Sequence, residues 1–260
     1  MKKVYSHSKI STFEQCALKY KYRYIDKIRI FEKSIEILLG SAVHDVLEYL
    51  YLEVKTGRTP SVDELITRYA NIWQDNYNSK IKIVKKELTE KDYFNKGVGF
   101  IVNYYMQHQP FKDNTLECEK KIIIQLGENN EYEIIGYIDR IVYNLEKNEY
   151  EVHDYKTANS LPTQESVDKD RQLALYSIAI KDLFGKEQQV NLIWHYLAHN
   201  TKIQSKRTNE QLEELKKEII NLIQQIESTT IFPHNKSILC GWCEYKSICP
   251  AHKNCSLGNI

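Results

Sequence analysis

Two short segments in the middle of the chain combine carboxylates with a lysine. The first, GYIDRI, contains Asp139, and the second, HDYKT, contains Asp154 and Lys156. Both segments are rich in β-branched and aromatic residues, which is typical of strands. Because residues two apart in a strand point to the same face, Asp154 and Lys156 are predicted to lie side by side.

The position of Asp139 relative to this pair depends on the turn that joins the strands, around 145–148. A two-residue turn at 146–147 places Asp139 opposite Asp154, and one at 147–148 places it opposite Lys156. Either register gathers the three groups on one face, whereas a three-residue turn would shift the pairing.

Two carboxylates and a lysine have a definite chemical use. Carboxylates are hard oxygen ligands for Mg²⁺ or Mn²⁺, which polarises a phosphate and generates a hydroxide nucleophile. A lysine orients that water or stabilises charge on the phosphate. The alternative interpretation is a cross-strand salt bridge on a solvated face of the sheet.

A second group of reactive residues lies near the C-terminus, in 239-LCGWCEYKSICP-250. Cys240, Cys243 and Cys249 have the spacing of ligands for a soft metal centre, and such a centre normally takes four thiolates. Cys255 would complete a local Zn²⁺ site. Cys118, inside TLECEKKI, is most simply a small buried apolar residue.

Composition limits the class of protein. The 260 residues are 42% apolar and 27% charged, as in ordinary globular proteins. The sequence has no run of roughly 20 apolar residues, and its start, MKKVYSHSK, lacks the apolar core of a secretory signal. We therefore expect a cytoplasmic protein without membrane association, in which six cysteines indicate metal or redox chemistry rather than disulfides.

Charge is distributed unevenly. Residues 1–40 carry nine Lys/Arg and four Asp/Glu (9 − 4 = +5), although the whole chain has a net charge of only +1. Within this region, 19-KYKYRY-24 alternates basic and aromatic side chains, a mixture that suits single-stranded nucleic acid. The alternatives are a solvated helix face for the charges and core packing for the tyrosines.

Hydrophobic periodicity and turn signals predict the order helices, β-meander, helix, strand, helix and cysteine tail. This order indicates a mixed α/β core with a helical N-terminal part, in one domain spanning residues 1–260. The expected helices are a first one capped by Ser11 and running to about Tyr24, then 36–56, one opened by Ser61, Thr89 to about His108, 164–184 and 208–228; the expected strands are 115–126, 131–143, 149–157 and 189–198.

The motif order resembles a known family. The segments around Asp139 and Asp154-Tyr155-Lys156 resemble the core of the PD-(D/E)XK nuclease superfamily, with Ile-Asp in place of Pro-Asp. Upstream, 40-GSAVHDVLE-48 resembles the G-x-x-x-H helix of RecB-like nucleases. Downstream, 171-RQLALY-176 resembles their Q-x-x-x-Y motif.

The resemblance implies a restriction-endonuclease-like mixed sheet flanked by helices, with a helical N-terminal elaboration and a C-terminal cysteine cluster. It implies that one or two Mg²⁺ or Mn²⁺ ions are held by His44, Asp139, Asp154 and the backbone carbonyl of Tyr155. It also implies catalytic roles for Asp139, Asp154 and Lys156, with the lysine or the scissile phosphate positioned by Gln172 and Tyr176.

RecB-like nucleases of the iron–sulfur type, including the AddB C-terminal nuclease and the CRISPR adaptation nucleases, supply the fourth thiolate from before the core. Cys16 matches that position, which implies a [4Fe-4S] cluster on Cys16, Cys240, Cys243 and Cys249. The chain would then comprise a mainly helical part (1–110), the nuclease core (111–230) and an iron–sulfur tail (231–260). Replacing Cys16 distinguishes this cluster from the local Zn²⁺ site.

The resemblance implies a metal-dependent deoxyribonuclease, an exonuclease or end-trimming enzyme on single-stranded DNA, acting in CRISPR adaptation or in recombination and repair. The sequence contains no G-x-x-x-x-G-K-[ST] phosphate loop, so a helicase motor would belong to a partner, as would other CRISPR adaptation components. The alternative is a non-catalytic iron–sulfur subunit that recognises DNA ends or junctions within a larger complex.

Overall fold

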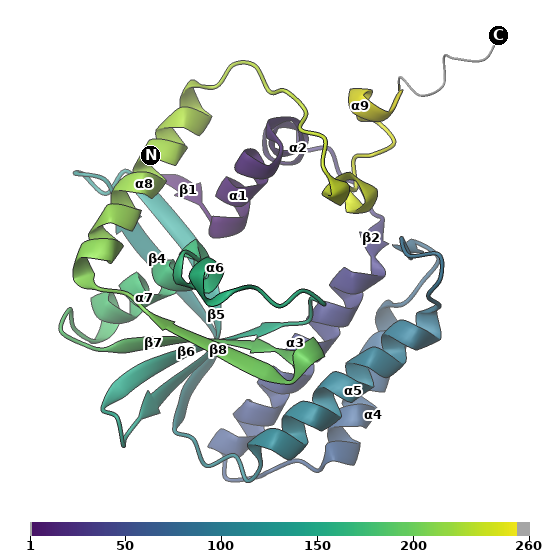
Figure 1. The fold of residues 1–260 in the computed structure, drawn as a ribbon, viewed down its shortest axis with the longest axis vertical. Coiled ribbons are helices and arrows are strands. Elements are labelled where there is room, and N and C mark those ends of the chain that lie inside the picture. Colours follow the sequence, from purple (N-terminus) through teal and green to yellow (C-terminus); the bar gives the residue numbers. More distant parts are fainter. Residues whose placement is uncertain (1, 254–260) are drawn as a thin grey trace.

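The computed structural model describes residues 2–253 and is built around a six-stranded mixed sheet (Figure 1). β4, β5 and β6 form the expected antiparallel meander, β7 is parallel to β6, and β8 is antiparallel to β7. The strands of this sheet are β1 (Lys3–Tyr5), β4 (Thr115–Leu126), β5 (Tyr132–Asn144), β6 (Glu149–Lys156), β7 (Val190–Tyr196) and β8 (Thr201–Lys206).

Helices account for most of the remaining described chain. A small two-stranded sheet, β2 (Lys33–Ser34) with β3 (Ile81–Lys82), lies beside them. The helices are α1 (His7–Gln15), α2 (Ala17–Tyr20), the π-helical turn η1 (Lys21–Ile25), α3 (Ile35–Lys55), α4 (Val62–Asn76), α5 (Glu90–His108), α6 (Gln164–Asp168), α7 (Arg171–Phe184), the 3₁₀ turn η2 (Leu197–His199), α8 (Asn209–Ser228), the 3₁₀ turn η3 (Ile238–Trp242) and α9 (Pro250–Lys253).

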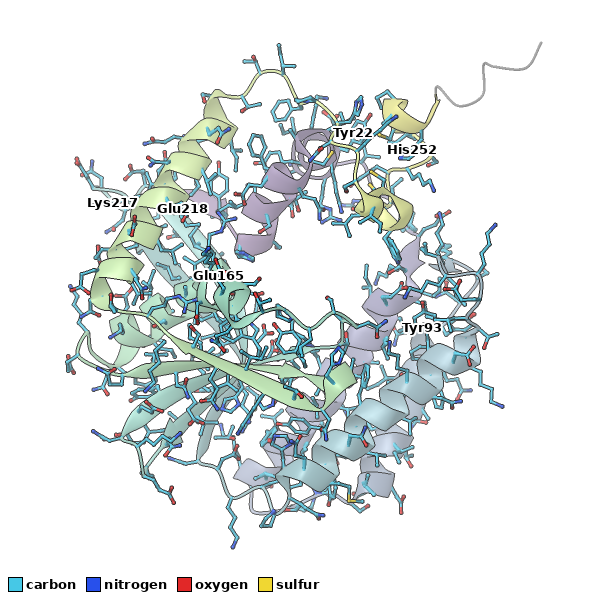
Figure 2. All side chains as sticks on the ribbon, in the orientation of Figure 1. Tyr22, Tyr93, Glu165, Lys217, Glu218 and His252 are labelled. Carbon is cyan, nitrogen blue, oxygen red and sulfur yellow. The ribbon has the colours of Figure 1, made fainter. Side chains whose placement is uncertain are left out.

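The sheet separates two apolar cores. One core joins the sheet to α1, α7 and α8, and the other joins it to α3, α4 and α5. Arg171 at the start of α7 pairs with Glu218 of α8 at 3.1 Å (Glu218 is labelled in Figure 2). This confirms the predicted mixed α/β fold, with a central sheet flanked by helices. None of the helices in residues 2–253 has the length and apolar content needed to cross a bilayer.

β5 is the strand that shapes the site, because its two edges are paired differently. One edge pairs with β4 from Tyr132 to Val142. The other edge pairs with β1 over 132–134 and with β6 over 140–144. Between these two ladders, residues 135–139 have no strand partner on that side, so the sheet opens into a notch that ends at Asp139.

The predicted N-caps can be compared directly with the structure. Ser61 and Thr89 each form a complete capping box, which confirms both predictions. The prediction of Ser11 as an N-cap was wrong. α1 begins at His7, and the Ser6 hydroxyl accepts the backbone N–H of Lys9 at 3.1 Å. Ser11 lies within this helix, because the short β1 already ends at Tyr5.

Two predicted helices are interrupted. The first ends at Cys16, whose backbone is extended (φ −165°, ψ 108°), before α2 and η1 continue to Ile25. The helix expected over 164–184 is divided at Lys169–Asp170, because the Asp170 carboxylate caps α7 by accepting the N–H of Leu173 at 3.0 Å. Local side-chain capping thus competes with a continuous helix at Asp170, whereas no side chain caps α2 at Cys16.

Four strands were not predicted, namely the two-residue β2 and β3 of the small sheet and, in the main sheet, β1 and β8. β1 has three residues, too few for a period-two pattern to be recognised. β8 reads TKIQSK and is largely exposed at the edge of the sheet, so it lacks the apolar alternation of a half-buried strand.

Candidate functional site

The β5–β6 register settles where Asp139 lies. Arg140 pairs with His153 and Asn144 with Glu149, so Asp139 is opposite Asp154, the first of the two predicted registers. The loop between the strands nevertheless contains four residues, 145–148. Beyond Arg140 the strands separate, and the Tyr155 N–H donates to Asp139 Oδ2 at 2.9 Å instead of to a strand carbonyl.

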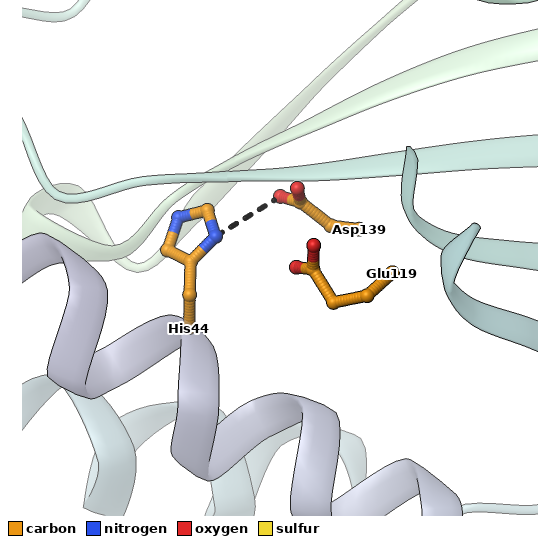
Figure 3. Close-up of side chains that lie close together, drawn as sticks. All are labelled: His44, Glu119 and Asp139. Atoms are coloured by element: carbon orange, nitrogen blue, oxygen red, sulfur yellow. Dashed lines mark ion pairs between the residues drawn. The ribbon is translucent and has the colours of Figure 1, made fainter. Parts of the chain in front are cut away.

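His44 reaches the same point from α3. Its Nε2 lies 2.8 Å from the carbonyl oxygen of Tyr155, and its Nδ1 lies 3.4 Å from Asp139 Oδ2 (Figure 3). The His44 side chain is 30% exposed and the Asp139 side chain 13% exposed. The structure therefore brings three of the four predicted metal-binding groups together at a position that solvent and small ions can reach.

Glu119 of β4 completes this group and was missed by the sequence analysis. One ligand atom each from His44, Glu119 and Asp139 lie within 4.8 Å of one another. The β4–β5 ladder, which pairs Cys118 with Arg140 and Lys120 with Ile138, places Glu119 across from Asp139. The sequence analysis considered only the β5–β6 turn, whereas counting outward from the β4–β5 turn would have revealed this neighbour.

Asp154 faces Lys156 rather than this group. The Lys156 ammonium lies 2.7 Å from Asp154 Oδ2 and donates to Gln172 Oε1 at 3.2 Å. Gln172 in turn donates to the Tyr176 hydroxyl at 3.2 Å, as expected for residues four apart on one helix face. Four of the five residues predicted as catalytic are thus connected in one series, whereas the fifth, Asp139, contacts His44 and lies opposite Asp154 in the strand register.

Gly136 allows α7 to approach this closely. A Cβ at residue 136 would lie only 2.7 Å from Cε1 of Tyr176. The glycine three residues before Asp139 therefore fixes where the Tyr176 ring packs against β5, and through Gln172 it influences where Lys156 is held.

The electrostatics of the site favour a bound cation. Burial, and then the charge of Asp154, raises the pKa of Asp139 above its usual range. Burial alone would lower the pKa of Lys156, but Asp154 outweighs it and the pKa is raised, so the lysine is held as a cation. Burial also raises the pKa of Tyr176 to about 12, which keeps the phenol neutral. One imidazole, carboxylates and the Tyr155 carbonyl form a donor set that fits Mg²⁺ or Mn²⁺.

The predicted iron–sulfur ligands also converge. Cys16, Cys240, Cys243 and Cys249 line one small cavity, together with basic side chains that include Lys19. His252, labelled in Figure 2, lines it as well. Across residues 2–253, three or more His, Cys, Asp or Glu ligand atoms come within 4.8 Å of one another only at the His44 group. In any set of three among these four sulfur atoms, at least one pair is therefore more than 4.8 Å apart. Cys255, the proposed fourth zinc ligand, lies outside the described residues.

Backbone N–H groups point at two of these sulfur atoms. The N–H of Asn235 donates to Cys16 Sγ and that of Ser237 donates to Cys240 Sγ, each at 3.4 Å. Hydrogen bonds to sulfur are among the features by which proteins tune iron–sulfur clusters. Burial raises the pKa of the Cys243 thiol.

Long-range contacts attach the cysteine segment to the N-terminal helices. Glu244 pairs with Lys19 at 3.5 Å and also with Arg23. Trp242 donates to Glu36, in the first turn of the helix that carries His44, at 3.2 Å. The two chain ends are thus held together by side chains as well as by the shared cysteine cavity.

Comparison with known proteins places the chain in a family. No curated protein matches it. The crystal structure of SSO0001 is 17% identical, covering 84% of this chain and 96% of that chain, with a TM-score of 0.38. A candidate exonuclease from Eubacterium rectale is 11% identical, covering 96% of this chain and 88% of that chain, with a TM-score of 0.51, and it shares the fold.

The family profile that matches is that of the PD-(D/E)XK nuclease superfamily, and the match extends over residues 4–250. It therefore includes the notch, the helix that carries His44, α7 and the four converging cysteines. The chain belongs to the PD-(D/E)XK nuclease superfamily.

Proposed function

We propose that this protein is a metal-dependent deoxyribonuclease that cleaves phosphodiester bonds at the β5–β6 notch. The observation that carries the proposal is the meeting of His44, Asp139 and the Tyr155 carbonyl beside Asp154 and Lys156. A cross-strand salt bridge alone does not account for this arrangement. It would require neither an imidazole from α3 nor a contact between that imidazole and a backbone carbonyl of β6.

Each residue has a role that follows from its contacts. His44, Asp139, Asp154 and the carbonyl oxygen of Tyr155 would hold Mg²⁺ or Mn²⁺, which supplies an activated water and polarises the phosphate. Lys156, held as a cation, stabilises negative charge that develops on the phosphate and orients the attacking water. Gln172 and Tyr176 fix the position of its ammonium group.

The substrate we propose is single-stranded DNA or a DNA end. A groove of about 680 Å³ runs beside the start of α3 and is lined by basic and aromatic side chains, among them Arg23, Lys27, Arg29, Lys33, Lys82, Phe31 and Trp242. Phe31 is 71% exposed, so its ring is free to stack on a base. Ile37 of the groove and His44 are seven residues apart on α3, on the same face and about 10 Å apart along the helix.

This arrangement would lead a strand from the groove to the notch over roughly two nucleotides. It supports an exonuclease or end-trimming enzyme, in CRISPR adaptation or in recombination and repair. A helicase or CRISPR adaptation partner would supply the DNA end. We also propose that the chain forms a single nuclease domain, since the cysteine tail packs on the same α3 helix that carries His44.

A [4Fe-4S] cluster on Cys16, Cys240, Cys243 and Cys249 is the second part of the proposal. The convergence of these four cysteines on one small cavity supports the proposal, because [4Fe-4S] clusters are held by four cysteine thiolates. Such a cluster would close a loop of more than 220 residues between Cys16 and Cys240 (240 − 16 = 224) and so stabilise the fold.

Metal analysis of Cys16→Ser tests the cluster, with Cys118→Ser as the matched control. Iron and acid-labile sulfide should be lost from Cys16→Ser and kept by Cys118→Ser. Unchanged metal in Cys16→Ser, with zinc instead of iron, would assign the metal to the local site that includes Cys255.

The test of activity is cleavage of end-labelled single-stranded DNA by anaerobically purified protein, with Mn²⁺, Mg²⁺ or a chelator. Metal-dependent cutting that is lost in Asp154→Ala and Lys156→Ala is the expected result, and the ladder from each labelled end reports polarity. The rival function is a non-catalytic iron–sulfur DNA-binding subunit. Tight DNA binding without cleavage by the cluster-loaded wild type in both metals would establish that rival.

A further inference from the structure

A second groove borders the notch on the α7 side of the sheet. It has a volume of about 510 Å³ and lies where β1 ends and α1 begins, next to β5 (Figure 1). Gln172 and Tyr176, which position Lys156, form part of its wall. Gly136 and Tyr137, from the part of β5 that has no strand partner on one edge, also line it. The groove is therefore continuous with the proposed site of cleavage.

The groove is short. The ladder between β1 and β5 covers 132–134, and its last pair, Tyr5 with Ile134, borders the groove. Asp139 lies five residues further along β5, which is about 17 Å in an extended strand. A DNA strand that enters from the notch therefore soon meets β1. The groove has room for the end of a strand and not for its continuation.

The charge of this groove suits a phosphate group. Among the described residues that line it, none is a carboxylate, and the basic side chains are His7 and Lys9. By comparison, the basic groove at the start of α3 also includes Glu32 and Glu244. A cleft lined by charge of one sign concentrates ligands of the opposite sign. The α7-side groove is thus suited to an anion.

Lys9 has no carboxylate partner. Its ammonium group donates to the carbonyl oxygen of Val4 at 3.0 Å and lies 4.1 Å from the centre of the Tyr5 ring, but it forms no ion pair within residues 2–253. The carboxylate of Glu227, on α8, pairs with Lys3 at 2.7 Å instead. Burial lowers the pKa of Lys9, because the ammonium group is partly removed from water without a paired charge. A phosphate in the groove would supply that charge.

His7 reaches the groove from the first turn of α1. Its Nε2 lies 3.3 Å from Ser11 Oγ, and its Nδ1 has no hydrogen-bond partner within the described chain. Burial lowers the pKa of His7, and the charge of Lys156 acts in the same direction, so the imidazole lies near the catalytic lysine. A phosphate one step beyond the scissile bond would meet this free ring nitrogen.

Tyr137 gives the groove an aromatic surface. Its side chain is 52% exposed, and within residues 2–253 its ring packs against no other aromatic ring. Stacking on an exposed ring binds any base, because every base has a π-face. The groove therefore combines basic groups for a phosphate with a ring for a base, which together match a nucleotide.

We propose that this groove binds the terminal nucleotide of the DNA strand, on the side of the scissile bond opposite the basic groove at the start of α3. Lys9 and His7 contact the phosphate of that nucleotide, and Tyr137 stacks on its base. The strand then passes through the notch from the α3 side of the sheet to the α7 side. This inference rests on the proposed nuclease function and gives a physical reason for cleavage near a strand end.

The experiment measures binding of thymidine 5′-monophosphate and thymidine 3′-monophosphate to the full-length, cluster-loaded protein by calorimetry, with thymidine as the ligand that lacks a phosphate. Four proteins are compared: wild type, Lys9→Gln, Lys3→Gln and Lys27→Gln. Lys3→Gln is the matched control, because it removes a lysine from the same N-terminal segment but outside the groove. Lys27→Gln removes a lysine from the basic groove. Circular dichroism and thermal unfolding verify that each variant is folded.

The wild type and Lys3→Gln should bind one of the two monophosphates about tenfold more tightly than thymidine, and Lys9→Gln should lose this difference. Tyr137→Ala should weaken binding of the monophosphate and of thymidine alike, because stacking does not depend on the phosphate. Equal monophosphate affinity in Lys9→Gln and Lys3→Gln would overturn the inference, as would no binding by the wild type. A loss in Lys27→Gln but not in Lys9→Gln would place the mononucleotide in the basic groove and would also overturn it.

A cleavage assay separates this inference from the nuclease proposal. The wild type should cut linear single-stranded DNA about tenfold faster than circular single-stranded DNA, and Lys9→Gln should raise KM for the linear substrate about tenfold with kcat nearly unchanged. Equal rates on the two substrates, or an unchanged KM in Lys9→Gln, would overturn the inference and leave the nuclease proposal intact. Absence of metal-dependent cleavage of either substrate would instead contradict the nuclease proposal.

Discussion

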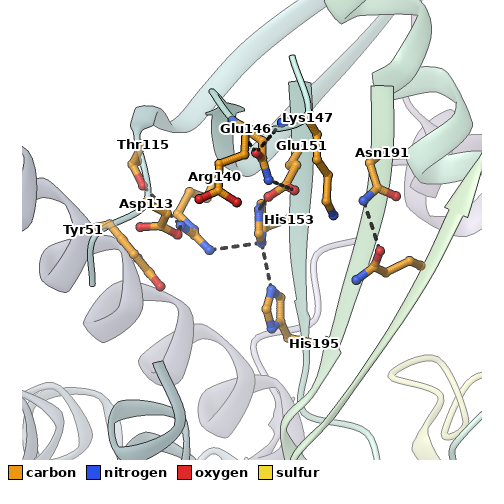
Figure 4. Close-up of polar contacts among 12 residues, drawn as sticks. Tyr51, Asp113, Thr115, Arg140, Glu146, Lys147, Glu151, His153, Asn191 and His195 are labelled. Carbon is orange, nitrogen blue, oxygen red and sulfur yellow. Dashed lines mark hydrogen bonds and ion pairs between the residues drawn. The ribbon is translucent and has the colours of Figure 1, made fainter. Parts of the chain in front are cut away.

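Asp139 and Arg140 are neighbours on β5, but their side chains enter opposite faces of the sheet, and the two faces treat charge differently. On the notch face, Asp139, Asp154 and Glu119 bring three carboxylates to one lysine. On the other face, Arg140 is 1% exposed and each of its three guanidinium nitrogens has a hydrogen-bond partner (Figure 4).

The partners of Arg140 come from β4, from β6 and from the loop that precedes β4. It donates to the Tyr155 hydroxyl at 3.0 Å and to Thr115 at 3.1 Å, and it pairs with Asp113. It also donates to His153 Nδ1 at 3.0 Å. Burial, followed by the charge of Arg140, lowers the pKa of His153, so this imidazole is neutral and accepts the bond.

The difference distinguishes a structural polar network from a functional one. A buried network whose members are all satisfied stabilises one packing arrangement. A group of carboxylates with too few cationic partners is stable only because it is small and partly exposed to solvent. Binding of a cation stabilises such a group. The notch face is therefore expected to determine activity, and the Arg140 face is expected to determine stability.

The largest effect is expected from Asp139→Asn. Cleavage should fall by about 10³-fold or more, equivalent to about 4 kcal/mol of transition-state stabilisation, because a ligand of the proposed divalent cation is lost. The amide oxygen can still accept the Tyr155 N–H, and the repulsion from Asp154 disappears. Urea unfolding should therefore show a free energy of unfolding equal to or higher than that of the wild type. A large loss of stability would contradict the assignment of this face to function.

Arg140→Met should have the opposite signature. Removing the cation leaves His153 and the Tyr155 hydroxyl buried, and Asp113 partly exposed, without their partner, which is expected to cost about 3–5 kcal/mol of unfolding free energy. Below the melting temperature, Mn²⁺ binding and cleavage should stay within about tenfold of the wild type. A stably folded Arg140→Met without activity would show that the two faces are not separable.

The sequence predicted the notch face better than the Arg140 face for a physical reason. Asp154 and Lys156 are two residues apart, so the period of a strand alone puts them together, and the turn limits where Asp139 can lie. Glu119 and Arg140 depend on the β4–β5 register and on tertiary packing. Nothing local in LECEKK indicates that Glu119 has a left-handed backbone (φ +45°). A buried arginine such as Arg140 has the same sequence signal as an exposed one.

The cysteines show the same limit. Spacing grouped Cys240, Cys243 and Cys249, but Cys16 joined them only through the family resemblance. In the structure Cys16 reaches the shared cavity because α1 ends there in an extended residue, and because the Leu18 N–H donates to the carbonyl oxygen of Pro233 at 3.0 Å. A contact between positions more than 200 residues apart leaves no local pattern to read.

A smaller effect is expected from Gln172→Ala, which tests how tightly Lys156 must be held. The substitution removes the bond from the Lys156 ammonium to Gln172 Oε1 but leaves the ion pair with Asp154. Cleavage should fall about tenfold in kcat, equivalent to about 1.4 kcal/mol, with KM nearly unchanged, because the lysine is positioned and not lost. Stability should change by less than about 1 kcal/mol, since Gln172 is half-buried. A rise in KM alone would place Gln172 in DNA binding instead.

The smallest effect is expected from Tyr176→Phe. This substitution tests whether a hydrogen bond that does not reach Lys156 still affects cleavage at the notch face. The hydroxyl contacts Gln172 and does not reach Lys156, so its removal loosens the side chain that positions the lysine. The ring keeps its packing against Gly136, and stability should be unchanged within about 0.5 kcal/mol. A two- to fourfold fall in kcat is expected, and Gln172→Ala combined with Tyr176→Phe should be no slower than Gln172→Ala alone. Additive losses in the double variant would mean that the Tyr176 hydroxyl contacts the substrate itself, and the chain of positioning contacts would then end at Gln172.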